Sequence, residues 1–277
     1  MSFDRRWLET FGSEDCHGRT LWALGECARS NFGDARRLWA KSLFIESLPA
    51  VETFTSPRAW AFALLGLDAY CATAPEDCRA HELRRLLADR LMAGLSSVEN
   101  AGWEWFEAGL AYDNARLPQA LIATGAALSE PAYTNAGLRT LRWLMDLQTS
   151  TEGIFRPVGS DSFGDKRKHP RAFDQQPLEA TAAVAACLAA WRPDGDPMWR
   201  AAAEMAFAWF LGSNDLSAPL IDLQTGSCRD GLHPDRANEN RGGESVVSYL
   251  LALTDIRRLS RTAGNCTIPA TVHTLHG

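Results

Sequence analysis

The chain has 277 residues, of which 28 are Lys or Arg and 34 are Asp or Glu, so its formal net charge is −6. Hydrophobic residues make up 46% of the chain and charged residues 22%, a balance that supports a buried core and excludes a disordered protein. Ala and Leu supply 76 residues, whereas Ile and Val supply 13. Because Ala and Leu favour helices and β-branched residues favour strands, this composition predicts an all-α fold.

The charge, the apolar runs and the Cys spacing also limit the compartments and partners that we expect. Nucleic-acid-binding proteins usually carry a basic excess, so we expect no nucleic-acid partner. No apolar run reaches the roughly 18 residues that a membrane span needs, and charges in Met1–Trp7 argue against a signal peptide. The seven Cys include no Cys-x-x-Cys pair, which favours reduced thiols over a disulfide or metal site. We therefore predict a cytoplasmic protein with no membrane partner.

Hydrophobic periodicity predicts nine helices, which alternate between an apolar and an amphipathic type. In chain order they cover about 16–30, 34–48, 57–73, 80–95, 114–128, 131–148, 175–191, 197–211 and 243–258. Residues 178–191 are apolar almost all round, whereas 80–95 carry one leucine stripe opposite a charged face. This alternation predicts a toroid of helical hairpins, with the apolar helices inside. We expect one domain over 1–277, with 1–14 and 260–277 as peripheral segments.

The connections between these helices are of two lengths. The turns from an apolar to an amphipathic helix are short, whereas the return connections 96–113, 149–174 and 212–242 are long. Loops of this length are uncommon unless they have a function. In a ring of hairpins they would all lie over the first turns of the inner helices. We therefore expect the functional site at that end of the ring.

Acidic residues occur where the long loops reach the inner helices. Asp113 and Asp174 share one pattern, an aromatic residue, Asp, an amide, two residues and Leu. Hydrolysis of a glycosidic bond requires two carboxyl groups, one as proton donor and one as base or nucleophile. We therefore predict Asp113 as base and Asp174 as acid, with Glu104 and Glu244 as the next catalytic candidates. The alternative, favoured for any single one of these acids, is a helix cap.

Aromatic and polar residues near these acids are candidate sugar ligands. Trp103 and Trp105 flank Glu104, and indole rings stack on the apolar faces of sugars. An equally supported alternative is that this aromatic cluster fills the core of the ring. The other predicted contacts to substrate are Asp15, His17, Arg19, Arg116, Gln175 and Asn240.

The sequence contains no clear signature of a metal or cofactor. The six His are dispersed, and no spacing resembles a zinc site. Neither a glycine-rich nucleotide motif nor a nucleophile elbow occurs. The run Lys166–His169 is more typical of a solvated surface than of an anion site. We therefore expect no metal and no cofactor.

Several stretches resemble the six-hairpin, (α/α)6-toroid glycosidase-like superfamily, and within it a bacterial group often labelled glycosyltransferase or glycosidase-associated. They are Phe3–Glu9, Gly12–Gly25, Tyr112–Leu117, Phe173–Ala180 and Glu239–Ser245. The resemblance covers most of the chain. It implies a carbohydrate-active enzyme, in the first place a glycoside hydrolase, with inversion as the expected outcome, that acts on a bacterial oligosaccharide. A sugar epimerase or isomerase, with His17 as base, and a non-catalytic sugar-binding or structural module are the alternatives.

Members of that bacterial group carry an earlier hairpin with its own acidic residues. Its absence here predicts an incomplete (α/α)6 barrel, which would be inactive or would complete its site from a partner. An open ring edge would also expose apolar side chains of 16–30 and 57–73. Since exposed apolar surface favours association, a homo-oligomer that covers this edge is a further expectation.

Overall fold

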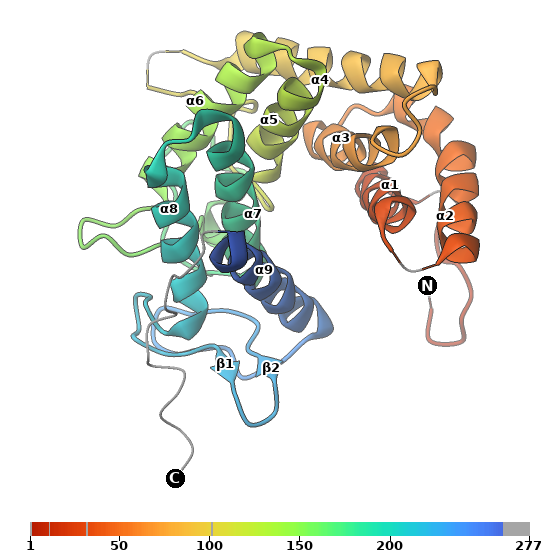
Figure 1. The fold of residues 1–277 in the computed structure, drawn as a ribbon. Helices are drawn as coiled ribbons and strands as arrows, with labels where there is room; N and C mark the ends of the chain where they lie inside the picture. The colour runs from red at the N-terminus through yellow and green to blue at the C-terminus, as the bar shows by residue number, and fades with distance from the viewer. Residues whose placement is uncertain (1, 11, 32, 101, 263–277) are drawn as a thin grey trace. The chain divides into compact units, whose positions relative to one another are not determined.

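The computed structural model describes residues 2–10, 12–31, 33–100 and 102–262, and their regular secondary structure is almost entirely helical (Figure 1). The α-helices are α1 (Glu14–Arg29), α2 (Asp34–Ser47), α3 (Pro57–Cys71), α4 (Cys78–Val98), α5 (Arg116–Leu128), α6 (Pro131–Leu147), α7 (Pro177–Asp194), α8 (Pro197–Ala208) and α9 (Gly243–Thr262). Short 3-10 helices are η1 (Leu48–Thr53), η2 (Ser160–Ser162) and η3 (Trp209–Leu211). Two-residue strands, β1 (Ile221–Asp222) and β2 (Ser227–Cys228), pair antiparallel. Over the described residues, the all-α prediction and the nine predicted helices are confirmed.

Helix ends differ from the predictions by a few residues, and local chemistry explains the differences. Helix α4 begins early because the side chain of Asp77 caps it by accepting a hydrogen bond from the amide of Ala80 at 3.0 Å. Helix α7 begins at Pro177, whose missing N–H is tolerated at the first helical position. It ends at Asp194, and Gly195 after it adopts the left-handed conformation that favours glycine. Of the expected C-terminal peripheral segment, 260–262 belong to α9 and 263–277 lie outside the described residues.

The chain divides into two compact units. Unit 1 comprises residues 1–108 and 116–143, and unit 2 comprises residues 109–115 and 144–277. In unit 1, α1 packs against α2 and α3, and α3 also packs against α4 and α5. The close approach of α1 and α3 depends on glycine, because a Cβ atom at Gly66 would lie 2.6 Å from the carbonyl oxygen of Leu21.

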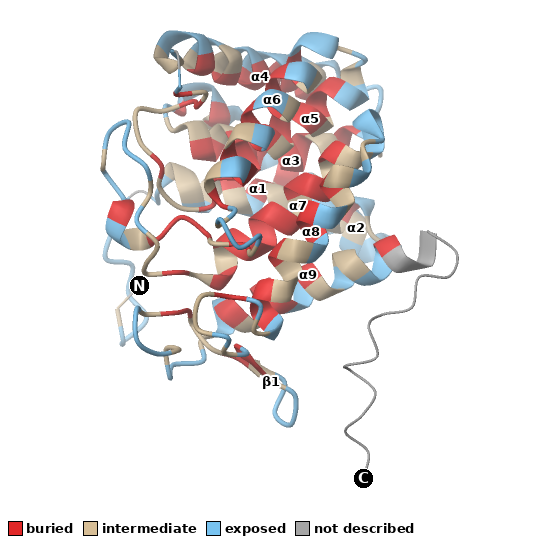
Figure 2. Ribbon diagram, turned by 90° about the vertical axis from the view of Figure 1, so that its left-hand side faces the viewer, coloured by how far each residue is buried: buried red, intermediate tan, exposed pale blue. Residues whose placement is uncertain are grey.

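Unit 2 is organised around α7, which packs against α8 and α9. Ala residues dominate α7, and most of its side chains are buried, as the red colour of this helix in Figure 2 shows. Small side chains allow neighbouring helices to approach it from several directions. The connection 149–174 leads to this buried helix, and Leu232 of the connection 212–242 pairs with Gln175 just before it.

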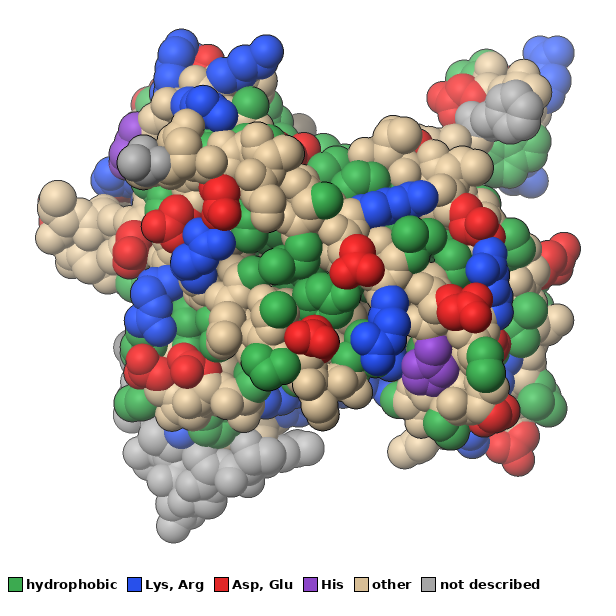
Figure 3. Space-filling view, turned by 90° about the horizontal axis from the view of Figure 1, so that it is seen from above, with side chains coloured by type: hydrophobic (Ala, Val, Ile, Leu, Met, Phe, Trp, Pro, Cys, Tyr) green, Lys and Arg blue, Asp and Glu red, His purple; other side chains and the backbone are tan. Residues whose placement is uncertain are grey.

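The predicted exposure of apolar inner helices is wrong for 57–73, because α3 is buried over most of its length. In unit 1 the exposed large apolar side chains of the helices lie on α2, at Leu38, Trp39 and Ile45, and on α4, at Leu86. Basic and acidic side chains are intermixed on the face shown in Figure 3. Among the described residues, no helix is long and apolar enough to cross a membrane.

Candidate functional site

The first turn of α7 joins three separate parts of unit 2. Gln175, directly before this turn, exchanges two backbone hydrogen bonds with Leu232, at 3.0 and 2.9 Å. Loop 212–242 is thereby fastened to the start of α7. Gly231 permits this contact, because a Cβ atom there would overlap the carbonyl group of Gln175. Residues 109–115 reach the same turn through Glu179, which lies within it.

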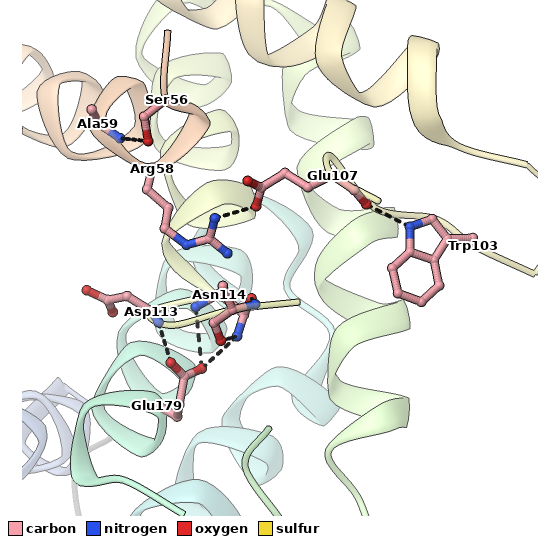
Figure 4. A network of polar contacts seen from close by, with 9 residues as sticks. Ser56, Arg58, Ala59, Trp103, Glu107, Asp113, Asn114 and Glu179 are labelled. Carbon is pink, nitrogen blue, oxygen red and sulfur yellow. Dashed lines mark hydrogen bonds and ion pairs between the residues drawn. The ribbon is translucent and has the colours of Figure 1, made fainter. Parts of the chain in front are cut away.

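Glu179 is buried, and its carboxylate accepts hydrogen bonds from the backbone amides of Asp113 and Asn114 (Figure 4). It also accepts one from the Asn114 side chain, Nδ2 to Oε2, at 3.1 Å. Asn114 in turn pairs with the backbone of Ala111 through both ends of its amide, at 2.6 and 3.0 Å. These bonds hold Asp113 in a left-handed conformation, φ 53°, with its carboxyl group extended away from Glu179.

Burial raises the pKa of Glu179 to about 7, and the negative charge of Asp113 contributes in the same direction. The hydrogen bonds from residues 113 and 114 oppose this shift, because they stabilise the ionised form. Burial and charge outweigh them. Glu179 therefore exchanges its proton near neutral pH while it supports the backbone of a neighbouring acid. A buried group of this kind is typical of functional sites.

Asp174 lies three residues before the same turn and is partly exposed. Its Oδ1 atom is 2.7 Å from Nδ1 of His233, a residue of loop 212–242. The two side chains are 35% and 27% exposed, so solvent and a ligand can reach both. The backbone carbonyl of Asp174 accepts a hydrogen bond from the amide of Ser160 at 2.9 Å. The pair is thus an accessible acid and imidazole held by two loops.

Gln175 connects this pair to a second polar network. Its side-chain oxygen accepts a hydrogen bond from Nε1 of Trp209 at 2.7 Å, and its Nε2 donates to Asp215 at 2.5 Å. Asp215 also forms a two-point ion pair with Arg156. Since both ends of the Gln175 side-chain amide are engaged in these bonds, its role is to position these neighbours.

The structure therefore brings three predicted residues, Asp113, Asp174 and Gln175, to one end of α7. It adds Glu179 and His233, which the sequence reasoning did not select. A detectable signal existed for Glu179, because this acid is followed by the uncharged run 180–191 in a buried helix. No local signal identifies His233 as the partner of Asp174, since 59 positions separate them.

The predicted candidates near α9 have a different setting. Asp230 accepts hydrogen bonds from the amide of Gly242 and the hydroxyl of Ser245, both at 2.6 Å, and so stabilises the first turn of α9. Glu244 is an exposed residue in that turn. Asn240 is exposed as well, and its backbone carbonyl accepts a hydrogen bond from the amide of Asp230 at 2.9 Å.

Four predicted substrate-binding residues belong to the helices of unit 1. His17 contacts the Ser47 carbonyl through Nε2 at 2.8 Å. Asp15 pairs with Arg19 at 2.9 Å, and the guanidinium of Arg19 lies over the ring of Phe62. The buried Arg116 lies over the ring of Trp22. These contacts orient helices α1, α3 and α5.

The aromatic candidates of the loop before residue 109 are packed in unit 1. Trp105 is fully buried and stacks on Trp143, with ring centroids 5.8 Å apart. Trp103 is nearly buried, meets Trp143 edge-on and donates a hydrogen bond to the carbonyl of Glu107 at 2.8 Å (Figure 4). Glu104 forms an ion pair with Arg139 at 3.4 Å. Burial of both indoles favours the core-filling alternative over stacking on sugar.

Metal and thiol chemistry have little support in the described part of the chain. Its His, Cys, Asp and Glu residues include no group of three that could hold a metal ion. Its six cysteines are free thiols. Burial raises the pKa of Cys187 to about 12 and that of Cys228 also to about 12, so neither is a reactive thiolate.

The fold has a counterpart among known structures. The chain is similar to a GH76 α-mannanase of Bacteroides thetaiotaomicron, with a TM-score of 0.61 and 10% sequence identity, over 90% of this chain and 70% of that chain. That enzyme has an (α/α)6-toroid glycosidase fold, so the similarity confirms the expected fold class. No protein-family profile matches the chain, and no curated protein matches its sequence. At this identity the likeness concerns the fold alone, and the six-hairpin detail and the bacterial group remain predictions.

Proposed function

We propose that this protein is a glycoside hydrolase in which Asp113 and Asp174 act as a carboxyl pair on an oligosaccharide. The observation that supports this most directly is the anchoring of Asp113 by Glu179 in the first turn of α7. Asp174 lies three residues before Pro177, where that turn begins, so two acids from distant parts of the sequence both lie at this helix end. Cleavage of a glycosidic bond needs such a pair.

In this proposal Asp174 donates a proton to the leaving oxygen, and Asp113 activates the attacking water. His233, at 2.7 Å from Asp174, is placed to return a proton to it after each turnover. Glu179 is a positioning residue, because its carboxylate holds the backbone of Asp113 while the Asp113 side chain extends away from it. The similar enzyme is an α-mannanase, so α-linked manno-oligosaccharides are the first substrates to test.

The test compares Asp113→Asn and Asp174→Asn with Asp235→Asn, which removes an exposed carboxylate in loop 212–242. Release of reducing sugar is measured on manno- and gluco-oligosaccharides, and melting temperature is measured in parallel. The first two variants should lose about 10²–10⁴-fold in turnover without a drop in melting temperature, whereas the control should retain activity. If a variant is destabilised but fully active, its Asp is only a cap. Binding of oligosaccharides by the wild-type protein without turnover would establish the non-catalytic module instead.

The anomeric outcome is tested in the same assay by following the product with proton NMR. We propose inversion, which requires the two carboxyl groups to lie about 6.5–9.5 Å apart around the bound sugar. Inversion is supported if the product first released has the anomeric configuration opposite to that of the cleaved bond. Release of the same anomer would indicate a retaining mechanism, in which one of the acids is a nucleophile.

A second candidate function is sugar epimerisation, which the Asp174–His233 pair favours. The sequence suggested His17 as the base, but His17 contacts a backbone carbonyl of unit 1, whereas His233 has a carboxylate partner. An imidazole oriented in this way could remove a proton from a sugar carbon. An epimerase incubated with free sugar in D₂O incorporates deuterium at that carbon, and His233→Gln should abolish the exchange while His81→Gln should not. A hydrolase shows no carbon-bound deuterium.

A further inference from the structure

A cavity of about 310 Å³ lies in unit 2, between the loop that follows α6 and the segment that leads into α7. Its polar lining consists of hydroxyl groups and cationic or imidazole side chains. They are Thr149, Ser150, Thr151, Arg156, His169 and Arg171. The remaining lining residues are apolar, so within the described structure no carboxylate lines this cavity. Its volume is at the lower end of the roughly 300–1,000 Å³ range of small-molecule sites.

Arg156 is held at this cavity by a chain of polar contacts that leads from the surface to the buried Trp209. Asp215 accepts hydrogen bonds from its Nε at 2.9 and 3.0 Å and also from its Nη2. Asp215 is itself bound by Gln175, which is fixed by Trp209. Asp215 binds the Nε and Nη2 atoms of the Arg156 guanidinium, and Nη1 takes no part in this ion pair. An arginine fixed in this way loses little conformational entropy when it binds an anion.

The other wall of the cavity is positively charged. Residues 165–171 contain four Lys and Arg residues and one acid, in a protein whose net charge is −6. That acid, Asp165, is shared between Arg171 at 3.5 Å and Lys168 at 3.6 Å, so it does not neutralise both. Arg171 remains 60% exposed. Of this segment, Arg171 and His169 line the cavity, so the lining holds a second guanidinium in addition to that of Arg156.

The cavity adjoins the proposed catalytic residue along the chain. Its last lining residue, Ala172, precedes Asp174 by two positions. Their Cα atoms can therefore be at most ~7 Å apart. A sugar unit in the cavity would lie within reach of a unit held at Asp174. Arg156 contributes a second connection, because its partner Asp215 is bound to Gln175, the residue after Asp174.

We propose that this cavity binds the anionic group of an acidic sugar next to the sugar unit held at Asp174. The guanidinium groups of Arg156 and Arg171 bind the carboxylate of a uronate or the phosphate of a sugar phosphate, and the hydroxyls of 149–151 bind ring hydroxyls. Charge-assisted pairs of this kind are the strong, directional ones. This inference rests on the proposed function, because it specifies the class of oligosaccharide that the hydrolase accepts.

Isothermal titration calorimetry at low ionic strength, with D-glucuronate, mannose 6-phosphate and mannose as ligands, tests the proposal. At least one of the anionic sugars should bind about ten-fold or more tightly than mannose, a preference that rising salt weakens. Whichever of D-glucuronate and mannose 6-phosphate binds more tightly identifies the carboxylate or the phosphate as the anionic group that the cavity prefers. Equal affinity for neutral and anionic sugars, or no binding of any of the three, would overturn the proposal.

Arg171→Gln is the main variant, because its exposed side chain can be replaced with little effect on folding. It should weaken the anionic sugar about ten-fold and leave mannose unchanged. Arg156→Gln should act in the same direction, whereas Arg236→Gln, an exposed arginine of loop 212–242, should have no effect. Unchanged affinity in both Arg171→Gln and Arg156→Gln would exclude this cavity as the site.

This binding assay also separates the two proposals from each other. A monosaccharide binds without any bond being cleaved, so Asp174→Asn should retain its affinity for the acidic sugar. If the protein binds glucuronate through Arg171 but hydrolyses no oligosaccharide, only the hydrolase proposal fails. If it hydrolyses neutral oligosaccharides and is indifferent to acidic sugars, only the cavity proposal fails.

Discussion

The buried carboxylate of Glu179 binds the backbone amide of Asp113, which lies 66 positions earlier in the chain. This contact fastens residues 109–115 to the first turn of α7 and sets the direction of the Asp113 side chain. It also places two acids close enough for the charge of Asp113 to raise the pKa of Glu179. Stability, pH response and the geometry of the proposed site are therefore linked at this point.

Stability should depend on pH through Glu179. Its pKa rises from 4.5 to about 7 on folding, so between these values the folded state holds a proton that the unfolded state has lost. The free energy of unfolding should fall by up to ~3 kcal/mol as the pH rises from about 4.5 to 7, and level off above. Urea denaturation from pH 5 to 8 measures this. Glu179→Gln should remove the slope, whereas Glu204→Gln, on the exposed face of α8, should retain it.

Asp113→Asn should shift that pH profile as well. The variant removes the negative charge that, after burial, is the next contribution to the raised pKa of Glu179. The midpoint of the stability change should therefore move below pH 7 and stay above 4.5, since burial is unaffected. The same urea series at several pH values measures the midpoint. An unchanged midpoint would show that the two carboxyl groups do not interact.

Replacement of Gln175 by an apolar side chain of similar size should destabilise the protein. Gln175→Met leaves Nε1 of Trp209 and Oδ2 of Asp215 without this partner in a buried environment. An unsatisfied buried polar group costs about 1–3 kcal/mol, so we expect a loss of about 2–4 kcal/mol for the two groups. Chemical denaturation measures it, and Gln224→Met, at an exposed position of the β1–β2 turn, should be neutral. Equal stability of both variants would mean that the network contributes nothing.

The crossing of α1 and α3 should not tolerate a methyl group. A Cβ atom at Gly66 would lie 2.6 Å from the Leu21 carbonyl oxygen, so Gly66→Ala should cost about 2 kcal/mol or more through overpacking. Gly94→Ala is the matched control within α4, where the nearest atom would be at an ordinary 3.7 Å. There, alanine should stabilise by about 0.5–1 kcal/mol because it restricts the unfolded chain. Similar melting temperatures for the two variants would contradict the close approach of the helices.

The helices were predictable because their determinants are local. The alternation of apolar and amphipathic stretches, the prolines at 57, 131, 177 and 197, and the high Ala and Leu content act within a few residues of each position. The repeated pattern around Asp113 and Asp174 also pointed to the segments that meet at α7. The role of the aromatic cluster was not predictable, because Trp103 and Trp105 are equally typical of a surface that stacks on sugars and of a hydrophobic core.

What only the tertiary structure decided is which side chains meet. Glu179 with Asp113 and Asp174 with His233 are pairs separated by 59 or more positions, and no periodicity encodes them. The burial of Glu179 also depends on tertiary structure, because the helices and loops packed around it raise its pKa. The amino-acid composition, rich in Ala and Leu, therefore determined an all-α chain by itself. Its chemistry depends on long-range packing, which brings charged groups into a low-dielectric interior where their interactions are strong.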